Sequence, residues 1–221
     1  MFKKVLVAED MDSINQAVVI LLNDLEIVDV SHSQYCDQAW LMAKKEILNN
    51  NPYDLLICDL SFKQDYREEK ISTGEELISK LKSESPNLKV IVNSIEDHPQ
   101  IVQNLWDSGN IDAYVCKDRH GIKYLKQAII ALNKGLTYNS PSIEKALSQK
   151  NLISLNNFEI SIVKFLSIGY TQERIEKELK KKSIKPNSKS AIEKRLKQLR
   201  EEFGADNNPH LVGLMKDLRL I

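Results

Sequence analysis

Short apolar runs alternate with amphipathic stretches along the first 133 residues. Apolar residues recur at helical spacing at Ile14, Ala17, Val18 and Leu21, and similar patterns follow later in the chain. Between the helical patterns lie five runs typical of strands, four of them mainly apolar: residues 4–8, 26–31, 55–58, 89–93 and 113–116. Strands that alternate with helices in this way predict an α/β fold, with a doubly wound, five-stranded parallel sheet.

Polar residues of a particular kind follow four of these strands. The first strand runs into Glu9 and Asp10, and the third runs into Asp59. The fourth strand is followed by Ser94 and the fifth by Lys117. Because open parallel sheets gather their chemistry at the carboxyl edge of the strands, we expect three carboxylates, a hydroxyl and an ammonium to meet there.

This set of groups points to metal-assisted phosphoryl chemistry. Three carboxylates in one cleft raise each other's pKa unless a cation lies among them. Oxygen ligands at a hard, partly hydrated site suit Mg2+, so we expect Glu9, Asp10 and Asp59 to bind it. An Asp beside Mg2+ can act as a nucleophile toward a phosphoryl group, with Ser94 and Lys117 holding the phosphoryl oxygens.

Residues 1–133 resemble the flavodoxin-like receiver domain of two-component response regulators. The resemblance rests on six residues in the family's order and spacing: Glu9, Asp10, Asp59, Ser94, Tyr114 and Lys117. It implies that a sensor histidine kinase phosphorylates Asp59 and that the Ser61 backbone carbonyl joins the Mg2+ ligands. It also implies that Tyr114 changes rotamer as Ser94 moves.

The chain departs from the receiver pattern at three places near the predicted site. Ile95 follows Ser94 where a small residue is usual, and Asp118 follows Lys117 where proline is usual. The loop 60–73 is longer than usual and mostly charged, and we interpret it as a solvated insertion. These departures make the predicted change of conformation on phosphorylation less certain than the phosphorylation of Asp59 itself.

The balanced total charge conceals an acidic first part and a basic last part. Residues 151–221 contain 14 lysines and arginines against 9 acidic residues, a net charge of +5, whereas residues 1–150 have a net charge of −5. Nine basic residues and one acid lie between Lys180 and Arg200. Such a division of charge is typical of a regulatory module joined to a module that binds an anion, and nucleic acid is the first candidate for that anion.

The basic part reads as a small all-α domain with a helix-turn-helix. Thr171 is expected to cap one helix, and Ser188 a second that carries an apolar stripe: Ile192, Leu196, Leu199 and Phe203. The outer face of the second helix is free for the major groove. Five exposed basic residues are the expected DNA contacts: Lys189, Lys194, Arg195, Lys197 and Arg200.

Residues 152–221 resemble the LuxR/NarL-type helix-turn-helix effector domain. The matching positions are Glu159, Gly169, Thr171, Ile175, Leu179, Ile192, Leu199, Phe203 and Gly204. The turn before the second helix is several residues longer than the common form. We therefore expect a receiver at 1–133, a linker at 134–151 and a DNA-binding domain at 152–221, which the resemblance predicts to form a homodimer when active.

The cysteines and the hydropathy pattern indicate a cytoplasmic protein. Cys36, Cys58 and Cys116 are odd in number and widely spaced, as expected of buried thiols in a reducing compartment. No apolar run approaches the length that spans a membrane.

The sequence thus predicts a non-enzymatic response regulator that binds double-stranded DNA and regulates transcription. Two alternatives stay open. In the first alternative, the basic domain binds protein or RNA. In the second, the chain is an aspartyl-nucleophile phosphatase. This second alternative is weaker, because such enzymes typically carry an acid two residues after the nucleophile, where this chain has Ser61.

Overall fold

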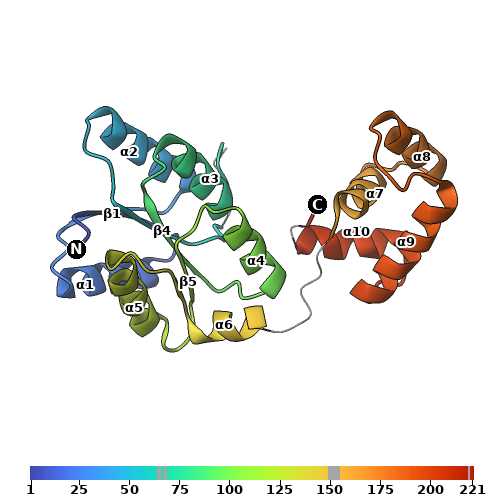
Figure 1. Ribbon diagram of the computed structural model, residues 1–221. Helices are drawn as coiled ribbons and strands as arrows, with labels where there is room; N and C mark the ends of the chain where they lie inside the picture. Colours follow the sequence, from blue (N-terminus) through green and yellow to red (C-terminus); the bar gives the residue numbers. More distant parts are fainter. Residues whose placement is uncertain (64–65, 67–68, 149–154, 219) are drawn as a thin grey trace. The chain divides into compact units, whose positions relative to one another are not determined.

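A computed structural model describes residues 1–63, 66, 69–148, 155–218 and 220–221 (Figure 1). The chain divides into two compact units, unit 1 at Met1–Lys150 and unit 2 at Asn151–Ile221. Among the described residues, no helix has the length and apolar character needed to cross a membrane.

Unit 1 is built on a parallel sheet with the predicted alternation of strands and helices. The order across the sheet is β2-β1-β3-β4-β5-β6, and every neighbouring pair is parallel. The strands are β1 Lys4–Ala8, β2 Asp29–Ser33, β3 Leu55–Cys58, β4 Lys89–Ser94, β5 Ala113–Cys116 and β6 Tyr138–Asn139. The predicted fold class is confirmed, but the predicted number of strands is wrong, because β6 extends the sheet beyond β5.

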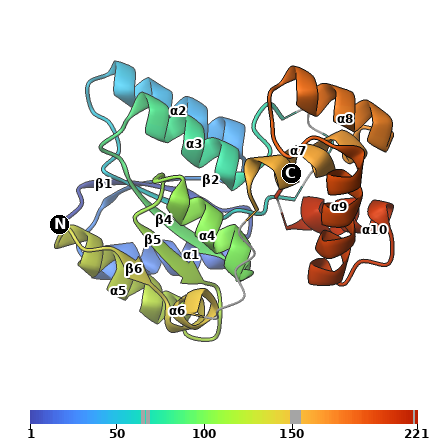
Figure 2. The same ribbon diagram turned by 45° about the vertical axis from the view of Figure 1, so that its right-hand side comes forward.

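Helices cover both faces of the sheet, which explains why its central strands are mostly apolar. One face packs against α1 Asp12–Asp24 and α5 Gly121–Asn133 (Figure 1). The other face packs against α2 Cys36–Leu48, α3 Gly74–Glu84 and α4 Pro99–Asp107 (Figure 2). Cys36, Cys58 and Cys116 are free and buried, as the sequence predicted.

The segment predicted as a linker is largely part of unit 1. β6 pairs with β5, with Ala113 opposite Tyr138 and Tyr114 opposite Asn139. The next helix, α6 Pro141–Ser148, packs against α4 and buries Ile143 in the core. The linker assignment is therefore wrong for residues 138–148, while its end and the expected apolar start at Leu152 lie outside the described residues.

Unit 2 is the predicted all-α domain. It contains α7 Asn157–Ser167, α8 Gln172–Lys181, α9 Lys189–Phe203 and α10 Asn208–Asp217. Thr171 and Ser188 cap α8 and α9 as predicted, accepting hydrogen bonds from Arg174 and Ala191. The predicted stripe of α9 faces the core, with Ile192, Leu196 and Leu199 fully buried and Phe203 packed against them.

Asp112, just before β5, ties together the starts of two strands and the end of a helix. Its carboxylate accepts hydrogen bonds from Lys89 Nζ at 2.7 Å, the Val90 amide at 3.0 Å and Lys82 Nζ at 3.2 Å. Burial raises the pKa of Asp112, but the hydrogen bonds from Lys89 and Val90 and the charge of Lys82 outweigh burial, so its net pKa lies below the ordinary value.

We expect Asp112→Asn to lower the free energy of unfolding at neutral pH by roughly 1 to 3 kcal/mol, because the charge-assisted bonds weaken. A depressed carboxyl pKa stabilises the fold above its unfolded value and loses that effect as the pH falls through the folded pKa. The difference between the two proteins should therefore shrink below a pH of about 4. Denaturant unfolding at several pH values measures this, with the exposed Asp107→Asn as control, and a pH-independent difference would contradict it.

Candidate functional site

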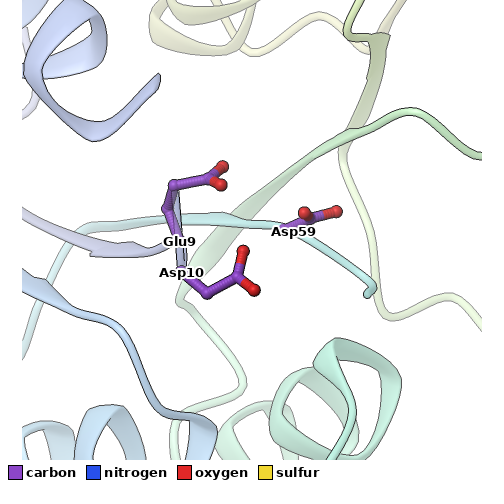
Figure 3. Close-up of side chains that lie close together, drawn as sticks. All are labelled: Glu9, Asp10 and Asp59. Atoms are coloured by element: carbon purple, nitrogen blue, oxygen red, sulfur yellow. The ribbon is translucent and has the colours of Figure 1, made fainter. Parts of the chain in front are cut away.

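The three predicted carboxylates meet at the carboxyl edge of the sheet. Glu9 and Asp10 follow β1, and Asp59 follows β3, its neighbour in the sheet. One carboxylate oxygen from each side chain lies within 4.8 Å of the others, and Figure 3 shows the three groups side by side. Backbone bonds fix this arrangement, since the Asp59 amide donates to the Ala8 carbonyl at 3.0 Å.

Lys117 supplies the positive charge at this cluster. Its Nζ lies 2.6 Å from Asp59 Oδ2 and 2.7 Å from Glu9 Oε2. The exposed fraction of the Lys117 side chain is 7%, and those of Glu9 and Asp59 are 2% and 6%. One ammonium therefore faces three carboxylates in a largely buried setting, which leaves an excess of two negative charges if all are ionised.

This charge excess makes the site suitable for a divalent cation. Burial, the largest effect, raises the pKa of Glu9; Lys117 lowers it in part and the charge of Asp59 raises it, so that the net pKa lies above the ordinary value. A hard cation among the three carboxylates would offset their repulsion, and an oxygen-only donor set matches Mg2+. The residues present thus fit the predicted metal.

Asp59 is held by the loop that follows it. Its Oδ1 accepts hydrogen bonds from the Leu60 amide at 2.6 Å and the Ser61 amide at 3.4 Å. The Lys63 amide donates to Asp10 Oδ2 at 2.9 Å, so the start of this loop closes over the carboxylates. The expected role of the Ser61 carbonyl stays a prediction.

The loop 60–73 is only partly the solvated insertion that we predicted. Leu60 and Ile71 are fully buried in the core of unit 1, and Phe62 packs against that core. Residues 64–65 and 67–68 lie outside the described part of the chain. The two ends of the loop are therefore structural, and they anchor the backbone beside Asp59.

Gly74 is a residue that the sequence analysis did not assign to the site. A Cβ atom at this position would lie 1.8 Å from the Asp59 carbonyl oxygen, so only glycine allows this approach. Its amide donates to the Leu60 carbonyl at 3.1 Å and returns the loop to the end of β3. The signal available in the sequence was a lone glycine at the start of a helix, which by itself indicates no particular contact.

Ser94 ends β4 and Tyr114 lies within β5, and both are fully buried. The Lys117 amide donates to the Ser94 carbonyl at 2.8 Å, which brings these two predicted residues together. Ser94 Oγ accepts from the Glu96 amide at 3.4 Å, and the Tyr114 hydroxyl donates to the Glu96 carbonyl at 2.8 Å. Glu96 therefore connects the predicted hydroxyl residue to the predicted switch residue through its backbone.

A second candidate site is the exposed face of α9 in unit 2. Lys194 and Lys197 are exposed there, and Lys197 lies 3.9 Å from Glu201 in an ion pair open to solvent. Lys189, at the start of α9, is also exposed and is paired with Glu173 of α8. Exposed pairs of this kind contribute little and exchange readily for another anion.

The prediction that Arg195 and Arg200 are exposed is wrong. Arg195 Nε lies 2.7 Å from Glu159 Oε1, its Nη1 lies 2.7 Å from Glu202 Oε1, and 23% of its side chain is exposed. Arg200 is half-buried and donates to Asn208 Oδ1 at 2.6 Å. Both arginines lie on the flanks of α9, where they join it to α7 and α10.

Glu159 has a structural role that explains its pairing with Arg195. It is buried and accepts from the amide of Asn156 at 2.7 Å, and Asn156 Oδ1 accepts from the Glu159 amide at 3.0 Å. This capping box begins α7, and the ion pair then ties α7 to α9. The contacts of Arg195 are accordingly those of a residue that holds the domain together.

Comparison with known proteins rests on structure, since neither a family model nor a curated protein matches the sequence. The chain is similar to RcsB in a structure of two RcsB dimers bound to two parallel DNAs. The identity is 23%, the TM-score is 0.66, and the match covers 97% of this chain and 98% of that one.

Two further structures show the same likeness. RcsB from Salmonella enterica serovar Typhimurium, bound to the promoter rprA with the phosphomimetic BeF3−, matches with 23% identity and a TM-score of 0.65 over 98% of this chain and 99% of that chain. The isolated REC domain of the same protein matches with 23% identity and a TM-score of 0.53 over 66% of this chain and 99% of that chain. At this identity the comparisons establish the fold alone, a parallel α/β unit followed by a helical unit.

We expect Arg195→Ala to destabilise unit 2 by about 1 to 3 kcal/mol, because it leaves the buried Glu159 carboxylate without its cation. Lys194→Ala is the matched control on the same helix, and it should change stability by no more than about 0.5 kcal/mol. Thermal and denaturant unfolding of the full chain measures both. Equal effects of the two substitutions would contradict the structural role of Arg195.

Proposed function

We propose that the chain is a response regulator in which Asp59 accepts a phosphoryl group from a sensor histidine kinase. The observation that carries this proposal is the bridging of Asp59 and Glu9 by the Lys117 ammonium, beside a third carboxylate and a buried serine. The likeness of the fold to RcsB supports the same reading.

Each residue of the site has a defined part in the transfer. An oxygen of Asp59 attacks phosphorus as the nitrogen–phosphorus bond of a phosphohistidine breaks, and the leaving imidazole keeps the electron pair and takes up a proton. Lys117 moves from the free carboxylate to the phosphoryl oxygens, and Ser94 donates its hydroxyl proton to another. Bound Mg2+, held by Glu9, Asp10, Asp59 and the Ser61 carbonyl, would neutralise the charge that gathers on these oxygens.

The phosphoryl group then changes the surroundings of Ser94. Because the Glu96 backbone bonds both Ser94 and Tyr114, a shift of Ser94 toward the phosphoryl group alters the contact of the Tyr114 hydroxyl. New charge and strong acceptors at one point thereby bias a buried two-state element. We propose that this bias controls homodimer formation and DNA binding.

Unit 2 supplies the output by binding double-stranded DNA and regulating transcription. Lys189, Lys194 and Lys197 lie exposed on α9, the second helix of the helix-turn-helix. Lysines on such a helix neutralise phosphates, and the RcsB structures with DNA support this use of the fold. The turn 182–188 is longer than the common three or four residues. We therefore expect the DNA sequence that this chain recognises to differ in detail from the sites of RcsB.

Two other functions fit the residues of this chain less well than a response regulator does. An aspartyl-nucleophile phosphatase needs an acid two residues after its nucleophile, and this chain has an exposed Ser61 there. An RNA-binding or protein-binding module would account for the basic charge of unit 2, but it gives no role to the helix-turn-helix arrangement.

We expect Asp59→Asn to abolish labelling by acetyl phosphate, because the amide lacks the nucleophilic oxygen anion. Mass spectrometry of the intact protein after incubation with acetyl phosphate and Mg2+ measures the label. Asp118→Asn, which changes an exposed carboxylate next to Lys117, is the control and should be labelled normally. Retention of the label in Asp59→Asn would remove Asp59 from its proposed role.

We expect the double variant Lys194→Ala, Lys197→Ala to bind duplex DNA at least tenfold more weakly, roughly the loss for two phosphate contacts. The slope of log affinity against log salt should become shallower by about 1.8 if both lysines contact phosphates. Lys180→Ala, at a lysine of α8 paired with Glu176, is the control. Unchanged DNA binding, or selective loss of RNA or protein binding, would favour the interaction module.

A further inference from the structure

A cleft lies between the first turns of α1 and α5, the two helices that pack on one face of the sheet (Figure 1). Its volume is about 220 Å3. Eight residues line this cleft: Ser13, Ile14, Ala17, Asn93, Lys117, Asp118, Gly121 and Ile122. Ser13, Asp118 and Ile122 are exposed, so a small molecule in solution can reach the space between the helices.

Asn93 is a polar residue on an otherwise apolar face of the sheet. Because side chains alternate along a strand, Asn93 of β4 faces the same side as Ile91, which is buried in the core beneath α1 and α5. Its neighbour across the sheet is Val115 of β5, which belongs to the same core. An amide therefore stands where a parallel sheet covered by helices usually carries an apolar side chain.

The side-chain amide of Asn93 has no hydrogen-bond partner in the described part of the chain. Only 4% of the residue is exposed. Neither its oxygen nor its nitrogen is sealed inside the protein, as Asn15 Oδ1 is, so both atoms reach the cleft that Asn93 lines. Buried polar groups in folded proteins are almost always hydrogen-bonded, and the unmet donor and acceptor of Asn93 thus point to a bound partner.

The charges around the cleft disfavour an anion. Lys117 is the one cation among the eight lining residues, and it is already paired with Asp59 and Glu9. Asp118 adds a carboxylate at the exposed rim. A negatively charged ligand would therefore meet repulsion from Asp118 without gaining an unpaired cation.

The shape of the cleft suits a flat ring that carries hydrogen-bonding groups on one edge. Ile14 and Ala17 of α1 and Ile122 of α5 provide apolar walls. The Asn93 amide offers a donor beside an acceptor, the pattern with which asparagine recognises the edge of adenine in nucleic acids. A volume of about 220 Å3 corresponds to roughly seven water molecules, which limits the ligand to a single small ring system.

We propose that this cleft binds a small, flat, uncharged molecule that presents a hydrogen-bond donor beside an acceptor to the Asn93 amide. A nucleobase such as adenine and a carboxamide on an aromatic ring such as nicotinamide share this chemistry. The ring would lie between Ile14 and Ala17 on one side and Ile122 on the other. The inference does not require Asp59 to accept a phosphoryl group.

Titration of the isotope-labelled full chain, followed by amide NMR signals, tests the site with two matched pairs of probes. Adenine is compared with purine, which lacks the amino donor, and nicotinamide with nicotinate, which is an anion. Saturable shifts are expected at Ala17, Gly121 and the Asn93 side-chain amide with adenine, nicotinamide or both. Purine and nicotinate should bind at least fivefold more weakly than their partners, roughly the factor for one net hydrogen bond.

Two substitutions examine the contacts separately. Asn93→Leu keeps the size of the side chain and removes the amide, so binding should weaken roughly tenfold, the factor for two net hydrogen bonds. Ala17→Leu narrows the cleft from its α1 wall and should abolish binding while Asn93 is intact. Asn87→Leu, at an exposed asparagine just before β4, is the control and should bind normally. Thermal unfolding verifies that each variant is folded.

The results distinguish a ligand site from a cleft filled by water. Preference for adenine over purine, or for nicotinamide over nicotinate, together with loss of binding in Asn93→Leu and Ala17→Leu, is the expected outcome. The probe of higher affinity then identifies the source of the ligand as a nucleobase or a carboxamide. Equal binding within both pairs, or no saturable shift with adenine and nicotinamide, would overturn the proposal.

Discussion

The ammonium of Lys117 between the carboxylates of Asp59 and Glu9 is the interaction on which the rest of unit 1 depends. Two short ion pairs in a setting that is more than nine-tenths buried leave Asp10 and an excess negative charge beside them. A buried cluster of charges like this one is stable in a folded protein only if opposite charges lie close together and a further cation can reach the excess carboxylate. The parallel sheet provides the arrangement, because β1, β3 and β5 all end at this edge.

Strand β5 joins the site to the remainder of unit 1. One strand of four residues leads into Lys117, carries Tyr114 in the core and offers two backbone groups to Ser140. Glu96, on the neighbouring segment, links Ser94 to Tyr114 by its backbone alone, so its side-chain identity matters little there.

In unit 2, one helix presents basic residues in two different settings. Arg195 and Lys194 are adjacent in the sequence, yet the first pairs with the buried Glu159 and the second lies exposed to solvent. The difference follows from the helical period, which turns each successive residue by about 100°. On the flank of α9, Arg195 neutralises Glu159 of α7, whereas Lys194 and Lys197 on the outer face are exposed to solvent. The net positive charge of unit 2 therefore overstates the charge that the outer face of α9 offers to a polyanion.

The parallel sheet, its covering helices and the meeting of Glu9, Asp10 and Asp59 with Lys117 could be predicted from the sequence, because buried strands and the polar residues after them leave a pattern along the chain. The stripe of α9 and the caps at Thr171 and Ser188 could be predicted in the same way. The place of residues 138–148 in unit 1, the approach of Gly74 to Asp59 and the ion pair of Arg195 with Glu159 became visible only in the folded chain. These features are pairings between residues distant in the sequence, and local periodicity contains no information about which distant partner a residue meets.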